Sequence, residues 1–124
     1  NSKARVSYQG NVDALMALAW NQDLETFSAL VEAAALDVHA YTVLVNNRKY
    51  GDSRVRSPAK ESFRRDLARL RGGENDFCVT VKLDVKSLRE FQSRAKQWPG
   101  KSDRFKSVPG GYRLLPKRRI KPPK

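Results

Sequence analysis

The stretch that decides the fold runs from residue 12 to residue 46 and reads VDALMALAWNQDLETFSALVEAAALDVHAYTVLVN. Residues 12–19 are apolar with one interruption and too short for a typical helix, which predicts a strand buried on both faces. Residues 23–39 repeat apolar side chains at three- and four-residue steps, which predicts an amphipathic helix. Residues 40–46 are apolar and rich in β-branched side chains, which predicts a second strand. This order predicts two parallel strands joined by a crossover helix, right-handed if both strands share one sheet.

Turn and cap residues flank this unit. Asn21 or Asp23 is placed to cap the first turn of the helix, where free backbone N–H groups need acceptors. Residues 52–57 alternate in polarity between Gly51 and Pro58 and predict one arm of a hairpin. The hairpin arm would follow the second strand directly.

The next apolar pattern lies at residues 77–83. Apolar and polar side chains alternate there, which predicts a strand with one buried face. Leu88 and Phe91 then indicate a short helix, with Asp84 or Ser87 as its cap.

The charge of the chain is concentrated near its end. The sequence has 25 basic and 13 acidic residues and a formal net charge of +12. Residues 92–124 hold 11 of the basic side chains and one acidic side chain, whereas residues 1–91 are nearly balanced. Proline and glycine recur from Trp98 onward. We therefore expect a folded segment at residues 1–91 and a basic, mostly irregular tail at residues 92–124.

The tail has what sequence-independent nucleic-acid binding requires. Its lysines and arginines neutralise phosphates, and Trp98, Phe105 and Tyr112 offer rings on which bases stack. We expect RNA or DNA as a partner; the alternative is a tail that docks on an acidic surface of its own assembly or stays solvated. Residues 48–71 add nine basic side chains and predict a second positive surface. The candidate nucleic-acid contacts in the tail are Arg94, Lys96, Lys101, Arg104, Lys106, Arg113, Lys117, Arg118, Arg119 and Lys121.

The composition argues against several classes of protein. Cys78 is the only cysteine and His39 the only histidine, so the sequence predicts no internal disulfide, no metal site and no cofactor. No apolar run approaches the roughly 18 residues of a membrane helix, so we expect no membrane partner, and a reducing cytoplasm fits best. We interpret Cys78 as a strand residue facing a covering helix rather than as a nucleophile, and His39 as a helix-end residue.

The order of several short motifs between about residues 10 and 91 resembles the part of the nitrilase (carbon-nitrogen hydrolase) superfamily that follows its catalytic cysteine. Ala34 stands where that family has an arginine. Residues 31–58 are more specifically similar to nitrilase-like domains fused to bacterial reverse transcriptases of antiviral defence systems. The residues that carry the resemblance are Gly10 to Leu15, Ala19-Trp20-Asn21, Ala34, Ala35, Asp37, Asn46, Gly51, Ser53, Pro58, Lys82 to Val85, and Leu88-Arg89.

The resemblance implies an α/β fold, namely the C-terminal part of an α-β-β-α sandwich. The glutamate, lysine and cysteine of the family lie upstream of the matched region, so we assign no catalytic residue to this chain. It implies as partners the remainder of the nitrilase-like domain, a reverse transcriptase domain and further copies in a homo-oligomer. The substrate-pocket candidates are Trp20, Asn21, Gly51 and Ser53.

The same residues also have structural interpretations. Trp20 can pack over the sheet edge, Asn21 can cap the helix, and Gly51 and Ser53 can shape a turn. A rival hypothesis for the whole chain is a stand-alone basic nucleic-acid-binding module without enzymatic activity, whose fold would be complete by itself. An enzyme centred on Cys78 is a third hypothesis.

Overall fold

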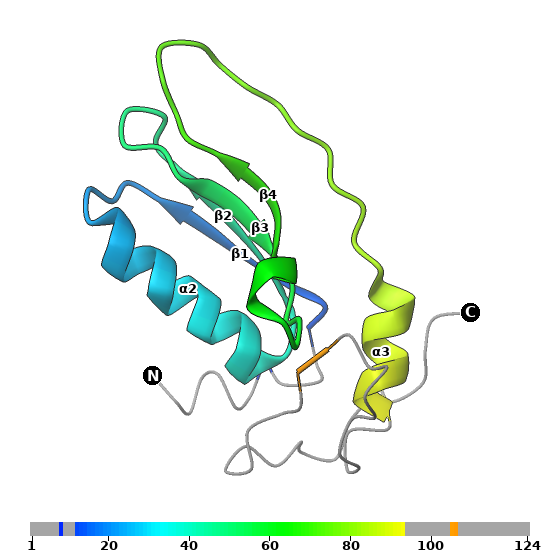
Figure 1. The fold of residues 1–124 in the computed structure, drawn as a ribbon. Coiled ribbons are helices and arrows are strands. Elements are labelled where there is room, and N and C mark those ends of the chain that lie inside the picture. The colour runs from blue at the N-terminus through cyan, green and yellow to red at the C-terminus, as the bar shows by residue number, and fades with distance from the viewer. Residues whose placement is uncertain (1–7, 9–11, 94–104, 107–124) are drawn as a thin grey trace.

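The computed structural model describes residues 8, 12–93 and 105–106. Within them, the strands form one four-stranded mixed sheet in the order β1-β2-β3-β4. Figure 1 shows α2 lying along the sheet and α3 at the end where β1 and β2 begin. The elements are β1 (Ala14–Ala19), α2 (Leu24–Val38), β2 (Tyr41–Asn46), β3 (Ser53–Arg56), the 3-10 helix η1 (Ser62–Arg64), β4 (Asp66–Leu70) and α3 (Val85–Ser93).

The first three of these elements form the predicted parallel unit. β1 and β2 pair in parallel, with Ala14 opposite Tyr41 and Ala19 opposite Asn46. Helix α2 connects the two strands, so the predicted order of strand, helix and strand in one sheet is confirmed.

Both ends of α2 are fixed by local chemistry. The Asp23 carboxylate accepts a hydrogen bond from the Thr26 N–H at 3.2 Å, so Asp23 is the N-cap. His39 ends the helix in the left-handed conformation, with φ 58°, and its N–H donates to the Ala35 carbonyl. The prediction that His39 is a helix-end residue is confirmed.

The second half of the sheet is antiparallel. β3 is the predicted hairpin arm and pairs with β2, with Val43 opposite Val55. β4 pairs antiparallel with the other edge of β3, with Val55 opposite Ala68. The sequence did not predict β4, because the segment DLARL has no β-branched or aromatic residue and lies in a charged stretch of the chain.

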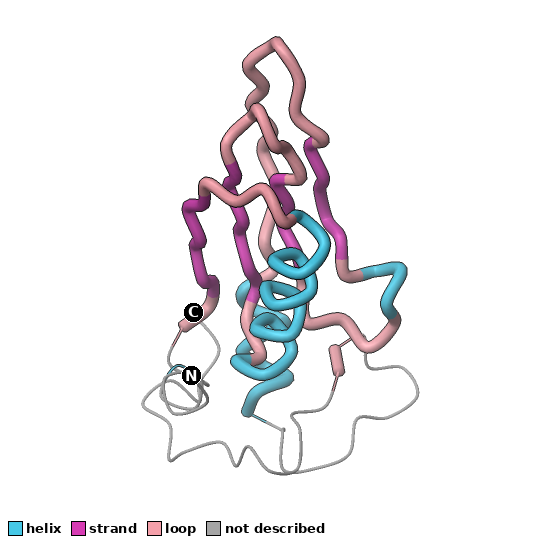
Figure 2. Tube along the Cα trace, turned by 90° about the vertical axis from the view of Figure 1, so that its left-hand side faces the viewer, coloured by secondary structure: helices cyan, strands magenta, loops and turns pink. Residues whose placement is uncertain are grey.

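The two faces of the sheet have different surroundings. Helix α2 covers one face and buries Val31, Ala35 and Val38, and Figure 2 shows it crossing in front of the strands. On the opposite face Met16 is 79% exposed and Leu18 is 84% exposed. The expectation that this strand is buried on both faces is therefore wrong, because α2 covers only one of them.

The hydrophobic core lies at the end of the sheet where β2 begins. It consists of Tyr41, Leu88, Phe91 and Phe105, with Ala14 and Leu83 packed against it. Leu88 and Phe91 come from α3, whose start is capped by the Asp84 carboxylate through the Ser87 N–H at 3.0 Å. The predicted short helix and its Asp84 cap are thus confirmed.

One predicted strand is not formed. Residues 77–83 have no helix or strand assignment, and Phe77, Cys78 and Val79 are exposed. Alternating polarity stabilises a strand only where another strand supplies hydrogen bonds and a layer covers the apolar side. The described residues supply neither, so the interpretation of Cys78 as a strand residue facing a covering helix is wrong.

The described part of the chain is a small mixed α/β fold with a four-stranded mixed sheet and two α-helices. Within that part, neither helix has the length and apolar character needed to cross a membrane.

Candidate functional site

Asn46 ties several loops together at the end of the sheet where β1 and β2 finish. Its side-chain carbonyl accepts hydrogen bonds from the N–H groups of Asn21 and Asn47, both at 2.9 Å. Its side-chain NH₂ donates to the carbonyls of Asn21 and Gly51, both at 2.9 Å. Its backbone N–H donates to the Ser53 hydroxyl at 3.0 Å. One buried residue therefore fixes the β1–α2 loop and the β2–β3 turn.

The β2–β3 turn approaches the end of β4 so closely that only glycine fits. Gly51 has φ 79°, and a Cβ there would lie 1.9 Å from the Arg71 carbonyl oxygen. Gly72 has φ 87°, and a Cβ there would lie 2.5 Å from the Arg48 carbonyl oxygen. Both positions also need the left-handed conformation that glycine adopts freely. The two turns therefore pack as one unit.

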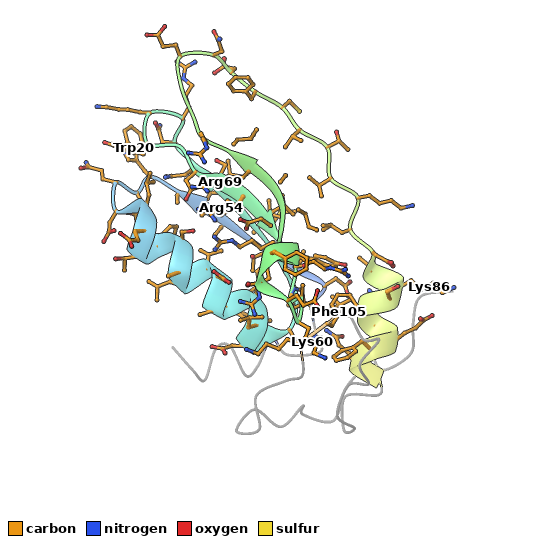
Figure 3. All side chains as sticks on the ribbon, in the orientation of Figure 1. Trp20, Arg54, Lys60, Arg69, Lys86 and Phe105 are labelled. Carbon is orange, nitrogen blue, oxygen red and sulfur yellow. The ribbon has the colours of Figure 1, made fainter. Side chains whose placement is uncertain are left out.

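Three of the four predicted pocket residues meet at this unit. Asn21, Gly51 and Ser53 all bond to Asn46, so each has a structural role in the arrangement of the loops. Trp20 does not join them: it is 74% exposed, and Figure 3 shows it at the outer end of the sheet. The interpretation that Trp20 packs over the sheet edge is wrong.

A network of ion pairs covers the α2 side of β3 and β4. Asp52 accepts two hydrogen bonds of 2.8 Å from Arg54 and one of 2.7 Å from Arg69. Arg54 also reaches Asp66 at 3.1 Å, and Asp66 accepts from Arg56 at 2.9 Å. Figure 3 shows Arg54 and Arg69 on these two neighbouring strands. Cross-strand pairing thus places like charges beside each other with carboxylates between them.

Two arginines extend this network to α2. Arg56 is 3% exposed and donates to the Ser28 hydroxyl at 2.7 Å. Arg65 pairs with Glu32 at 2.8 Å and donates to the Ala59 carbonyl at 3.1 Å. The network therefore joins β3, β4 and the loop before β4 to the helix.

The electrostatics of Asp52 follow from these neighbours. Burial by itself raises the pKa of Asp52, but hydrogen bonds and positive charges from Arg54 and Arg69 outweigh burial and hold the pKa below its usual value. The hydrogen bond and charge of Asp52 raise the pKa of Arg54 above its usual value. Asp52 therefore stays ionised at neutral pH.

The predicted second positive surface at residues 48–71 is reduced by pairing with carboxylates, although Lys49, Lys60 and Arg71 are exposed. Arg54, Arg56 and Arg65 are internal and bound to carboxylates. Arg48 pairs with Asp76 at 2.8 Å. A count of basic residues in the sequence overestimated the positive charge of this surface, because these arginines form ion pairs with carboxylates.

The sheet face opposite α2, which we call the open face, carries Met16, Leu18, Val43, Val45 and Val55. It borders a groove with a volume of about 530 Å³ between the sheet and the extended segment around residues 75–79. Apolar side chains line most of this groove. Met16 and Leu18 of β1 are exposed beside its lining residues Val43 and Val45. Exposed apolar patches are typical of surfaces that bind another protein, a membrane or a ligand.

One part of the predicted tail belongs to the core. Phe105 is 4% exposed, forms an isolated bridge with Ala59, and packs against Phe91 and His39 with ring centroids 5.5 and 6.1 Å apart, respectively. Lys106 donates its N–H to the Pro58 carbonyl at 2.9 Å. The expectation that Phe105 stacks on bases is wrong, because its ring is buried.

Apart from Phe105 and Lys106, the residues of the tail that were predicted to contact nucleic acid lie outside the described residues. The rings of Trp98 and Tyr112 are among them. Lys106 is the one described member of the nucleic-acid set, and its side chain is exposed. The undescribed basic candidates are Arg94, Lys96, Lys101, Arg104, Arg113, Lys117, Arg118, Arg119 and Lys121.

The described residues contain no group of three histidine, cysteine or acidic side chains placed to hold a metal ion. His39 is fully buried, its Nε2 bonded to the Lys106 carbonyl at 2.8 Å, whereas Cys78 is exposed. Burial thus keeps the imidazole away from the surface on which the thiol lies.

Sequence reasoning missed the two structural centres of the site, Asn46 as a hub and Asp52 as the centre of the ion-pair network. A signal for the second was available, since Arg54 and Arg56 alternate along one strand and share one face, and Asp52 lies just before that strand. No family model, no curated protein and no solved structure matches this chain.

Proposed function

We propose that the chain is the C-terminal part of a nitrilase-like domain whose second sheet covers the open face. The observation that carries this proposal is the exposure of Met16 and Leu18 on an otherwise regular sheet whose other face is covered by α2. Two sheets that pack face to face bury such apolar side chains between them. An α-β-β-α sandwich needs one helix layer on the outer face of each sheet, and α2 meets that requirement for this one.

In this proposal the chain positions a substrate pocket and does not carry out the reaction. The thiolate nucleophile, the general base and the oxyanion-stabilising lysine come from the upstream part of the domain. Trp20 stands exposed at the carboxyl end of β1, where ligand groups gather in α/β folds. Asn46 holds the loops around it through Asn21, Gly51 and Ser53.

The wider setting is a cytoplasmic, reverse-transcriptase-linked defence protein that handles nucleic acid and assembles as a homo-oligomer. The resemblance of residues 31–58 supports the link to a reverse transcriptase. The excess of basic residues at 92–124 supports the contact with RNA or DNA.

The decisive experiment is the intact mass of the native protein, determined together with the sequence upstream of Asn1. We expect a longer chain with a glutamate, a lysine and a cysteine in the order of the nitrilase superfamily. Amide hydrolysis by that longer protein, abolished by substitution of its upstream cysteine, is the expected activity. A native chain without these residues would overturn the proposal.

A second candidate is a stand-alone nucleic-acid-binding module. The observation that favours it is the docking of Phe105 in the core, which anchors one part of the basic tail on the folded part. Such a module unfolds cooperatively by itself and remains monomeric. Aggregation through the open face would count against it.

A further inference from the structure

A second groove lies between η1 and the residues that lead into α3, at the opposite end of β3 from the Asn46 turn. It has a volume of about 260 Å³, and Arg64 and Lys82 both line it. Ala59 and Phe105 line it as well, so the anchored tail segment forms part of its wall. We call this site the η1 groove.

Two lysines flank the groove at the tail anchor. Ala59 and Phe105 form an antiparallel bridge and point inward, where both are buried. Lys60 and Lys106 directly follow these two groove residues; neither lines the groove itself, and both are exposed beside it. Figure 3 shows Lys60 below η1 beside the labelled Phe105, whereas Lys86 on α3 points away.

An aromatic ring stands beside these cations. Phe63 is 75% exposed on η1, and the Arg64 guanidinium lies 5.4 Å from its ring centroid. An open ring next to a guanidinium group is the arrangement on which single-stranded bases stack.

The acidic residues near the groove do not cancel its charge. Glu61 forms an exposed pair with Arg64 at 3.2 Å, which a phosphate can replace at little cost. The Asp84 carboxylate caps α3 through the Ser87 N–H and hydroxyl and keeps its charge, so two carboxylates stand against the four cations Lys60, Arg64, Lys82 and Lys106. The lysines at positions 60, 82 and 106 have exposed side chains directed to solvent.

We propose that the η1 groove and its rim bind single-stranded nucleic acid, with phosphates on the lining residues Arg64 and Lys82 and on the neighbouring Lys60 and Lys106, and with a base stacked on the adjacent Phe63. The inference rests on the proposed contact between the tail and nucleic acid and extends that contact to the folded part. Because Lys106 directly follows the groove residue Phe105, the remaining basic sequence starts next to the groove. The site selects single strands because its ring needs an unpaired base.

The test is fluorescence anisotropy of the full chain with labelled oligo(dT), oligo(rU) and a matched duplex over a series of salt concentrations. Phe63→Ala should weaken binding of both single strands about tenfold. Lys60→Ala and Lys82→Ala should each lower the slope of log affinity against log salt by about 0.7. Unchanged far-UV circular dichroism will show that these exposed substitutions leave the fold intact.

Matched controls lie at the other end of the sheet. Lys49→Ala removes one exposed cation from the β2–β3 turn, and Phe77→Ala removes one exposed ring from the segment beside the open face. Both should bind within about twofold of the unmodified chain. Equal losses for control and groove variants would overturn the inference, as would equal affinity for polyglutamate, because they would indicate attraction of any polyanion.

A tail variant separates this inference from the proposed function. Replacing Lys117, Arg118 and Arg119 with alanine should weaken binding and leave the effect of Phe63→Ala intact. If only the tail variant loses affinity, the groove inference is wrong and the tail proposal stands. If the unmodified chain binds neither oligonucleotide, both fail.

Discussion

Asn46 satisfies more of the surrounding backbone than any other side chain at its end of the sheet. Its replacement by alanine would leave the Asn21 N–H and the Gly51 carbonyl without their partners. Each buried polar group that loses its hydrogen bond costs about 1–3 kcal/mol. We therefore expect Asn46→Ala to lower the free energy of unfolding by about 3 kcal/mol, measured by urea denaturation.

The neighbouring residue provides the control for this prediction. The Asn47 side chain accepts one local hydrogen bond, from the Lys49 N–H at 2.8 Å. Asn47→Ala should cost about 1 kcal/mol. Similar losses for the two variants would show that Asn46 is not the hub of the loops.

Gly51 is the second residue whose identity the fold fixes. Gly51→Ala would bring a Cβ to 1.9 Å from the Arg71 carbonyl oxygen at a φ of 79°. Clash and strain together should lower the free energy of unfolding by about 3 kcal/mol. Gly73 has a positive φ of 139° but open space around it, so Gly73→Ala should cost about 1 kcal/mol in the same denaturation experiment. Equal costs would mean that the close approach to β4 is unimportant.

At the scale of the element, the spacing of apolar residues correctly predicted the elements that depend on a single segment of the chain. The stripe of α2, its Asp23 cap and the apolar runs of β1 and β2 are local features, and all three elements form. β4 and the unformed strand at residues 77–83 show the limit, because a strand depends on the partner beside it. DLARL forms a strand because β3 pairs with it, while the better alternation at 77–83 has no partner among the described residues.

The candidate site shows the same limit. The resemblance identified Asn21, Gly51 and Ser53, and the structure brings them together. Asn46, which joins them, was identified in the sequence only as the last residue of a strand. The ion-pair network was missed because its members come from α2, β3 and β4. Only the sheet register reveals which charges face each other.

The ion pairs of Asp52 with Arg54 and Arg69 make the stability of the fold depend on pH. The pKa of Asp52 is lower in the folded chain than its usual value of about 3.9. A lowered carboxyl pKa contributes stability that is fully present above the unfolded pKa and is lost as the pH falls through the folded pKa. We therefore expect the free energy of unfolding to fall below about pH 4, and Asp52→Asn to weaken that dependence.

The measurement is urea denaturation of both chains between neutral pH and acid conditions. At neutral pH Asp52→Asn should already be destabilised by about 3 kcal/mol, because Arg54 and Arg69 lose the carboxylate between them. Asp76→Asn is the matched control, since its side chain is 94% exposed, and it should change stability by less than about 1 kcal/mol. Parallel pH profiles for Asp52→Asn and the unmodified chain would contradict the assignment.

At the scale of the whole molecule, the two faces of the sheet differ in what covers them. The α2 face is closed by apolar packing and ion pairs, and the open face is exposed. Exposed aliphatic side chains contribute little to the stability of the part that bears them, but they contribute strongly once another layer covers them. The same substitution should therefore have little effect on the stability of the isolated chain and a large effect in a longer protein that contains it.

Met16→Lys combined with Leu18→Lys tests this directly. In the isolated chain the double substitution should change the free energy of unfolding by less than about 1 kcal/mol and reduce self-association in sedimentation experiments. Leu44→Lys, at a position 3% exposed on the α2 side, should unfold the chain and serves as the buried control. In the proposed longer protein the double substitution should lower the melting temperature sharply, because two charges would enter the interface between the sheets. An unchanged melting temperature there would mean that no second sheet covers the open face, and the chain would then function as a binding module by itself.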